Sequence, residues 1–270
     1  MTNDSMEKGL LSQRQKVLLG QLATVVIVLA LWEYAAGRWV DVFFVSKPSL
    51  ISVKLWSELF ESSFYNDLRV TASEMFGGYA IGGFGGVILG VFLARWPVAA
   101  QICDPMFVAL NSIPRIALAP LLIIWFGIDM ASKIVLAATL VFFLTFFNTL
   151  AGILNVETGL VNVARVQGAS EWQIFTKVML PAATSWIMTG LRTALPFALI
   201  GVIVGEFLAA SEGLGYRLNQ YSTTYNTTGT MAMLIVMMAL MMMLNNVMIR
   251  IERRLLKWKP RSAYQVDTTY

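Results

Sequence analysis

The sequence has no histidine and only one cysteine, Cys103, among its 270 residues. A disulfide within the chain is therefore impossible, and Cys–His catalytic pairs and His-ligated metal sites are excluded. The carboxylates form no cluster on one predicted face that could act as a catalytic site. We therefore expect no catalytic residues, no metal ligands and no enzymatic activity in this chain.

Charge is also scarce. Asp, Glu, Lys and Arg make up 13% of the residues, against about 25% in a typical soluble domain. Hydrophobic residues make up 57%, and the mean hydropathy is +0.67. Long uncharged stretches therefore remain, which indicates a lipid environment. The basic pI of 9.2 comes from Lys and Arg at the ends of apolar segments. Because no basic face with interleaved aromatics is present, we expect no nucleic-acid partner.

Six apolar segments are each close to the roughly 20 residues that cross about 30 Å of hydrocarbon. They are residues 17–36, 70–94, 102–126, 134–154, 182–208 and 230–249. The sequence therefore predicts an all-α, polytopic transmembrane bundle of about six spans over residues 17–250. Residues 1–16 and 251–270 are predicted to be tails.

The distribution of Lys and Arg predicts the orientation of these spans. With both tails inside, the cytoplasmic side carries Lys8, Arg14, Lys16, Arg95, Arg165, Lys177, Arg250, Arg253, Arg254, Lys257, Lys259 and Arg261. The opposite side carries Arg38, Lys47, Lys54, Arg69, Lys133 and Arg217. This excess predicts a multi-pass membrane protein with both termini cytoplasmic.

The outer connection, residues 37–69, contains a turn at Ser46-Lys47-Pro48-Ser49 that leads into a short amphipathic helix. Leu50, Val53, Leu59 and Phe60 share one face of it, and Lys54, Glu58 and Glu61 lie elsewhere. Such a helix is typical of the membrane–water interface.

The inner connection, residues 155–181, predicts a helix, a break, a second helix and a stop. Gly168 allows the turn, and Ser170 can cap the second helix. Pro181 is expected to end that helix and start the next span. The segment offers a compact surface that another protein could bind. The alternative is an interfacial helix pair without a partner.

This inner segment resembles the coupling-helix signature of permeases in binding-protein-dependent ATP-binding cassette (ABC) importers. Gly168, Leu180 and Pro181 stand at the matching spacing, together with Ala164 and Val178. Asn162 and Val163 depart from the usual Glu and Ala of the signature. The resemblance implies that the following residues couple the chain to an ATPase: Ala164, Arg165, Gly168, Ala169, Ser170, Glu171, Leu180 and Pro181.

The flanking sequence is similar to the nitrate/sulfonate/taurine permease family over roughly residues 44–250. The shared stretches are Gly77-Gly78-Tyr79-Ala80-Ile81-Gly82, Asn111 to Leu121, Trp125-Phe126-Gly127-Ile128, Asn148-Thr149 with Gly152, and Gly205-Glu206 with Gly213-Leu214-Gly215-Tyr216. The resemblance implies a pathway formed by two permease copies, two separate ATPase subunits that hold ATP and Mg, and a periplasmic or lipid-anchored substrate-binding protein. The chain has no Gly-x-x-x-x-Gly-Lys-[Ser/Thr] run, so it cannot cradle ATP phosphates in that way. We expect it to bind no cofactor.

Four glycines, Gly78, Gly82, Gly86 and Gly90, recur every four residues in the second span. This spacing places them on nearly one helix face, where another helix backbone can approach closely. A substrate groove is the alternative interpretation.

Polar groups inside spans are functional candidates because their burial in lipid is unfavourable. Arg115, Asn148, Arg192 and Glu206 are the candidates for the pathway. Pro114 and Pro120 are expected to interrupt the third segment beside Arg115. Either arginine could attract an anion, or could instead pair with a carboxylate or reach a headgroup. Glu74 stands where the family often has a basic residue, and pairing with a neighbouring helix is one interpretation of it.

The leading functional hypothesis is a permease that moves a small anionic solute by ATP-driven alternating access. An ion-coupled secondary transporter is the alternative, which would usually show inverted repeats and more ionisable groups at mid-membrane. Sulfonates, taurine and nitrate all remain open as substrates, because the binding protein does most of the selection in such systems.

Overall fold

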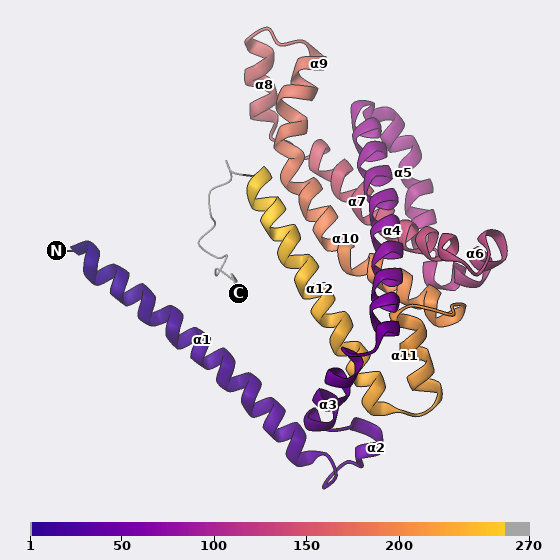
Figure 1. Ribbon diagram of the computed structural model, residues 1–270. Coiled ribbons are helices and arrows are strands. Elements are labelled where there is room, and N and C mark those ends of the chain that lie inside the picture. Colours follow the sequence, from indigo (N-terminus) through magenta and orange to yellow (C-terminus); the bar gives the residue numbers. More distant parts are fainter. Residues whose placement is uncertain (1, 257–270) are drawn as a thin grey trace. The chain divides into compact units, whose positions relative to one another are not determined.

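The computed structural model describes residues 2–256, which are almost entirely helical (Figure 1). An isolated bridge between Ala36 and Val40 is the single β-type pairing within that range. The elements are α1 (Thr2–Ala35), α2 (Val42–Val45), α3 (Pro48–Glu58), α4 (Ser62–Arg95), α5 (Pro97–Ser112), the 3₁₀ helix η1 (Arg115–Leu118), α6 (Ala119–Phe126), α7 (Met130–Leu154), α8 (Thr158–Val166), α9 (Glu171–Ile174), the π-helix η2 (Phe175–Met179), α10 (Leu180–Leu208), α11 (Leu214–Thr223) and α12 (Thr227–Leu255).

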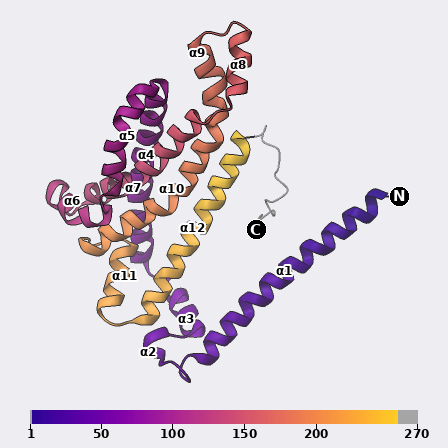
Figure 2. The same cartoon turned by 180° about the vertical axis from the view of Figure 1, so that it is seen from behind.

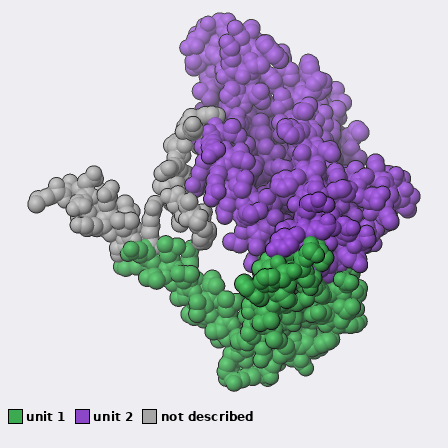
Figure 3. Space-filling model, in the orientation of Figure 1, with its two compact units in different colours: residues 1–64, 218–235 green, residues 65–217, 236–270 purple. Residues whose placement is uncertain are grey.

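The chain forms two compact units, coloured separately in Figure 3. Unit 1 comprises residues 1–64 and 218–235, and unit 2 comprises residues 65–217 and 236–270. Each unit is described by itself below.

Five helices are long and apolar enough to cross a membrane. They are residues 15–35 of α1, then α4, α7, the continuous run 171–208 and α12. A sixth span requires α5 together with η1 and α6, and this pair is bent by 73°. The predicted multi-span helical fold is therefore confirmed, and the third apolar segment, residues 102–126, is interrupted by a bend.

The bend in the third span follows from its proline. Pro114 has no N–H to donate, and its ring disfavours the helical conformation for the residue before it. Ile113 accordingly adopts an extended conformation, with φ −67° and ψ 126°. The helix stops at Ser112 and resumes as η1 at Arg115.

The glycine face of α4 lies directly against α7 in unit 2. A Cβ atom added at Gly78 would lie 2.9 Å from the carbonyl oxygen of Ile134, and one at Gly90 would lie 2.8 Å from the Cβ of Thr149. Only glycine permits such a close approach of the two backbones. The structure thus gives this face a packing role, as the four-residue spacing predicts.

A second close contact joins α7 and α10. A Cβ at Gly201 would lie 2.7 Å from the Cα of Ala137. Phe146 and Ile153 of α7 are fully buried in the apolar core near the α8–α9 end of unit 2, together with Ala183 of α10. These contacts make α4, α7 and α10 the packed centre of unit 2.

The prediction that Pro181 ends a helix is wrong. The run α9, η2 and α10 is a continuous helix from Glu171 to Leu208. One π turn precedes the proline, and within it the N–H of Leu180 donates to the carbonyl of Phe175, five residues earlier. We attribute the continuity to this turn, because the wider spacing of a π-helix leaves room for a ring that would clash with an α-helical carbonyl.

Unit 1 joins the end of α1, the short helices α2 and α3, and the start of α12. The carboxylate of Glu33 accepts hydrogen bonds from the backbone N–H and the hydroxyl of Ser49, at 3.0 and 2.7 Å. The hydroxyls of Ser46 and Thr228 are hydrogen-bonded at 2.8 Å. Hydrogen bonds therefore connect α3 to the end of α1, and the residue that follows α2 to the start of α12.

The predicted apolar face around α3 is exposed in the structure. Leu50, Val53, Leu59 and Phe60 are all exposed, as an interfacial helix requires. Glu58, which the sequence predicts to lie away from that apolar face, is fully buried. Its burial is possible because the Tyr221 hydroxyl donates to it at 2.5 Å and Lys54 Nζ lies at 2.7 Å.

Both predicted tails extend into helices. Residues 2–16 are part of α1, and α12 continues to Leu255. The remainder of the predicted C-terminal tail, from residue 257, lies outside the described residues.

Candidate functional site

The loop between α8 and α9 is built around a left-handed glycine. Gly168 has φ +82°, a conformation that side chains with a Cβ rarely adopt. The N–H of Gly168 donates to the carbonyl of Arg165, and that of Ala169 donates to the carbonyl of Ala164. These bonds end α8 in the manner of a glycine C-cap. The predicted helix–break–helix arrangement is confirmed here.

The start of α9 is held by a reciprocal cap. Ser170 Oγ accepts from the N–H of Gln173 at 3.3 Å, and Gln173 Oε1 accepts from the N–H of Ser170 at 2.8 Å. This is a capping box, which satisfies two otherwise free N–H groups. Arg165 Nη2 also donates to Glu171 Oε1 across the turn, at 2.9 Å. The loop is therefore ordered by its own residues.

The α8–α9 loop projects from one end of unit 2 in both ribbon views (Figures 1 and 2). Its apolar side chains are exposed, with Val166 89% accessible and Trp172 63%. Leu160 and Val163 are exposed on the same helix as Val166. An ordered surface with exposed apolar side chains is what an interaction site for another protein requires.

Two of the predicted coupling residues do not belong to this exposed tip. Leu180 packs, partly buried, against the apolar core of unit 2 that contains Leu93 and Phe146. Pro181 is exposed at the start of α10. The structure brings six of the predicted coupling residues together around the turn: Ala164, Arg165, Gly168, Ala169, Ser170 and Glu171. Leu180 and Pro181 lie outside the turn, at the start of α10.

Arg115 begins η1, immediately after the break in the third span. Its Nη2 donates to the carbonyl of Asn111 at 3.2 Å and to the side-chain oxygen of the same residue. The guanidinium carbon lies 4.2 Å from the centre of the Phe143 ring, in cation–π geometry. Arg115 is therefore held by neutral groups, which leaves its positive charge available.

Two further predicted pathway residues, Arg192 and Asn148, have hydrogen-bond partners of their own. Arg192 donates to Asn245 Oδ1 at 3.3 Å and pairs with Glu252 at 3.5 Å. The pairing with a carboxylate that the sequence left open is thus observed. Asn148 donates to the carbonyl of Leu144 within its own helix, at 2.8 Å.

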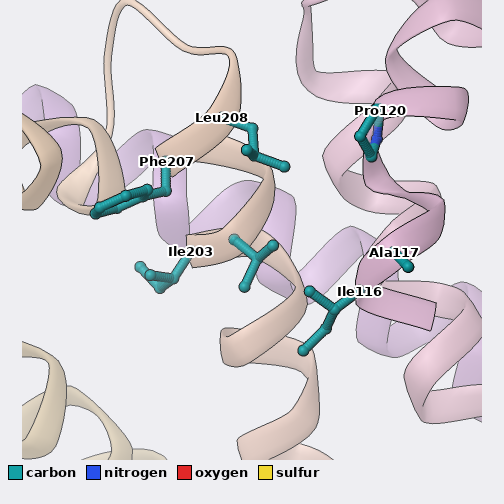
Figure 4. Close-up of a pocket in the computed structure, with 7 residues that line it drawn as sticks. Ile116, Ala117, Pro120, Ile203, Phe207 and Leu208 are labelled. Carbon is teal, nitrogen blue, oxygen red and sulfur yellow. The ribbon is translucent and has the colours of Figure 1, made fainter. Parts of the chain in front are cut away.

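A cavity of about 370 Å³ lies between the bent third span and α10 (Figure 4). Its lining is apolar: Ile116, Ala117, Pro120, Ile203, Val204, Phe207 and Leu208. Ile116 directly follows Arg115, so the cavity and the available cation are adjacent in the chain. No sequence pattern indicates this cavity, because the two segments that line it, residues 116–120 and 203–208, are far apart in the chain.

Glu206 belongs to a buried polar network that sequence reasoning missed. Its Oε1 accepts from the hydroxyl of Thr71 at 2.7 Å, and its Oε2 accepts from the N–H of Gly215 at 2.5 Å. Thr71 Oγ1 in turn accepts from the N–H of Leu214 at 2.8 Å. The side chains of α4 and α10 therefore satisfy the first free N–H groups of α11.

The same network includes two ion pairs. Asp67 accepts from the N–H of Gly213 at 2.8 Å and from Arg217 Nε at 2.7 Å. Lys133 Nζ lies 3.4 Å from Glu74 Oε1, which provides the neighbouring-helix partner that the sequence suggested for Glu74. The Gly205-Glu206 and Gly213-Leu214-Gly215 motifs were the one signal for this site, since a Cβ at Gly215 would lie 2.8 Å from the Cβ of Glu206.

The span pattern and the helical fold define a multi-pass membrane protein. Residues 86–257 match the family described as the inner membrane component of binding-protein-dependent transport systems. The chain is 33% identical over 237 residues to the putative aliphatic sulfonates transport permease SsuC of Escherichia coli, covering 86% of this chain and 89% of the relative. It is 30% identical over 240 residues to the protein of the same name in Bacillus subtilis, covering 88% and 86% of the two chains.

The fold also matches a solved transporter. A chain of the MetNI methionine ABC transporter, in an inward-facing conformation, aligns with a TM-score of 0.53 and 25% identity, covering 76% of this chain and 96% of that one. The chain belongs to the family of inner membrane components of binding-protein-dependent transport systems. It is an ABC importer permease, a transport component rather than an enzyme. This membership favours the importer hypothesis over the ion-coupled secondary transporter.

Proposed function

We propose that the chain forms, with a second copy of itself, the pathway through which a small anionic solute crosses the inner membrane. Two separate ATPase subunits bind ATP and Mg, and their closure drives alternating access. A periplasmic or lipid-anchored binding protein delivers the solute at the outer face. The sulfonate permeases among the relatives and the ABC transporter among the solved structures support this assignment.

The observation that carries the proposal is the ordered, exposed loop of α8 and α9. Its turn is fixed by Gly168, and its second helix is fixed by the Ser170–Gln173 capping box. Val166 and Trp172 present apolar surface at its tip. A loop of this stiffness transmits force from a bound partner into α10, because α9 continues through η2 into that helix without a break.

The orientation of the chain follows from the same assignment. The ATPases bind the α8–α9 loop, so this end of unit 2 lies in the cytoplasm. Arg165 and Lys177 belong to the same connection, and Arg95 ends α4. The accumulation of positive charge at one side supports a cytoplasmic location. Both chain termini then lie in the cytoplasm as well.

The proposed substrate is a small organic anion of the sulfonate kind. Arg115 offers a charge that is held by neutral groups, whereas Arg192 already pairs with Glu252. The apolar cavity beside Arg115 supports a solute that combines an anionic head with a hydrocarbon part. Taurine is itself a sulfonate and belongs to this class, and nitrate remains a candidate outside it.

The test is ATP hydrolysis by the permease co-expressed with its cassette ATPase. Gly168→Val is expected to reduce substrate-stimulated hydrolysis at least tenfold, because a β-branched residue is strongly disfavoured at φ +82°. Gly168→Asn should retain most of the stimulation, since asparagine tolerates this conformation.

Gly159→Ala provides the matched control in α8, where an added Cβ meets no atom within 4 Å. It should leave both the complex and its hydrolysis unchanged. If no ATPase co-purifies with the unmodified chain, the proposal is wrong. The same conclusion follows if Gly168→Val couples as well as Gly159→Ala.

A further inference from the structure

Five ionisable side chains are buried together where α4, α7, α10 and α11 meet in unit 2. The carboxylates are Asp67, Glu74 and Glu206, and the cations are Lys133 and Arg217. Each of these residues is less than one-tenth exposed, and Glu74 and Glu206 are only 0% and 1% exposed. Together they bring three potential negative charges and two positive charges into a buried region.

This excess of one negative charge is unfavourable. A buried charge without a counter-charge loses its hydration and gains nothing in return, so buried ionisable groups are paired or neutralised. Asp67 and Arg217 form a complete pair at 2.7 Å, and the N–H of Gly213 completes the coordination of Asp67. The imbalance therefore falls on Glu74, Glu206 and Lys133.

The hydrogen bonds distinguish the two glutamates. Glu206 accepts from the Thr71 hydroxyl and from the Gly215 N–H, which stabilises its ionised form. Glu74 has no such donors: neither of its oxygens receives a hydrogen bond of good geometry, and Lys133 Nζ approaches only to 3.4 Å. The two carboxyl groups also face one another.

We propose that Glu74 and Glu206 form a binding site for one proton, which resides on Glu74 and is donated in a hydrogen bond to ionised Glu206. The network is then neutral, because Glu206 balances Lys133 and Asp67 balances Arg217. Two adjacent carboxylates in a buried site cannot both remain ionised unless a further cation joins them. This inference does not depend on the proposed transport cycle, because it is drawn from packing and charge within unit 2.

Infrared spectroscopy of the full-length permease in lipid tests the proton directly. A protonated carboxyl absorbs in a region separate from that of a carboxylate. At neutral pH, the spectrum of the unmodified chain minus that of Glu74→Gln should contain the band of one protonated carboxyl group. Glu206→Gln should remove the same band, because Glu74 then ionises against Lys133. Asp67→Asn should not remove it, because Asp67 is ionised in its pair with Arg217.

Thermal unfolding of the same variants gives a second measurement. Glu74→Gln replaces a neutral acid by a neutral amide of the same shape, and its melting temperature should equal that of the unmodified chain. Asp67→Asn removes the carboxylate that pairs with Arg217 and accepts from the N–H of Gly213, and its melting temperature should fall clearly. The proposal is overturned if Glu74→Gln fails to fold or melts as early as Asp67→Asn, or if it removes no protonated-carboxyl band.

A bound monovalent cation in place of the proton is the competing outcome. In that case the melting temperature of the unmodified chain would rise with sodium or potassium concentration at constant ionic strength. Glu74→Gln would abolish that dependence. Such a result would replace the proton by a metal ion and overturn the proposal, whereas an unchanged melting temperature supports it.

Discussion

The Tyr221 hydroxyl donates to the fully buried carboxylate of Glu58 at 2.5 Å, and this bond joins α11 to the end of α3 within unit 1. Lys54 completes the arrangement, because its ammonium group lies 2.7 Å from the same carboxylate and 4.9 Å from the centre of the Tyr221 ring. A buried carboxylate with two donors is stable, whereas one that loses a donor is not.

Tyr221→Phe should therefore destabilise the protein. The variant keeps the ring and removes one hydrogen bond to the buried Glu58 carboxylate, and a hydrogen bond to a charged group contributes about 1.5–3 kcal/mol. Thermal unfolding of the purified permease measures the effect. Tyr225→Phe is the matched control, since Tyr225 is 75% exposed and its substitution should leave the melting temperature unchanged. Equal melting temperatures for the two variants would contradict the interpretation.

The same cluster predicts a loss of stability at alkaline pH. Burial raises the pKa of Tyr221, and the hydrogen bond to Glu58 adds to the effect. Burial alone would lower the pKa of Lys54, but its interactions with Glu58 and Tyr221 outweigh this and raise it. Both groups thus bind their protons more tightly in the folded chain than in the unfolded chain.

The direction of the pH effect follows from linkage. A group with a raised pKa in the folded state contributes stability that is present below its unfolded pKa and lost as the pH rises through the folded value. Because both unfolded values lie near 10, the loss should begin there. Melting temperatures measured from neutral to strongly alkaline pH test this, and Tyr221→Phe should show a smaller alkaline decline. An identical decline in the variant would assign the loss to other groups.

The close approach of α4 and α7 makes Gly82 intolerant of a side chain. A Cβ there would lie 2.9 Å from the Cβ of Val141 and still closer to the carbonyl oxygen of Ala138. Gly82→Ala should lower stability by about 1–3 kcal/mol, the range for an overpacked interior. Gly20→Ala in α1 meets no atom within 4 Å and should be neutral or slightly stabilising. Thermal unfolding of both variants in detergent measures the difference. Equal melting temperatures would show that the contact between α4 and α7 does not exclude a side chain at Gly82.

The sequence predicted those features that depend on neighbouring residues. Hydropathy predicted the spans, and Pro114 indicated an interruption of the third one. Gly168 and Ser170 predicted the helix–break–helix loop. The sequence did not predict the π turn before Pro181, because that turn depends on how the preceding helix accommodates the ring. Local pattern therefore established most of the fold.

The buried network shows why the remainder could not be predicted. Thr71 and Leu214 are 143 residues apart in the chain, and Asp67 and Arg217 are 150 apart. No periodicity links such partners, because their proximity arises from the packing of α4 against α10 and α11. Likewise, the sequence identified both Arg115 and Arg192 as candidates, and the structure distinguishes them by their different partners.

Arg115 and Arg192 should therefore respond differently when their charge is removed. Arg115→Gln should reduce uptake of an anionic solute at least tenfold in reconstituted vesicles with the ATPase and binding protein, since no described carboxylate within ion-pair distance neutralises Arg115. Arg192→Gln removes a partly exposed pair with Glu252, which is worth at most about 1 kcal/mol, and should leave uptake within about twofold. Equal losses would indicate that Arg115 has no special role in the pathway.

The exposed apolar face around α3 should contact lipid. Trp56 is 66% exposed and packs edge-to-face with Phe60, which is itself 73% exposed. The bonds from Glu33 to Ser49 hold α3 beside the end of the α1 span, at the depth where Trp is enriched in membrane proteins. Brominated lipids in reconstituted vesicles should therefore quench Trp56, and Trp56→Phe should reduce the lipid-quenched part of the fluorescence.

Trp172 in the α8–α9 loop is the matched control, because its exposed fraction of 63% is nearly the same. Trp172→Phe should instead reduce the part that acrylamide quenches from the aqueous phase in the permease without its ATPase. If Trp56 proves accessible to acrylamide and insensitive to brominated lipid, the face around α3 points to water. It would then be a surface for the substrate-binding protein rather than a membrane anchor.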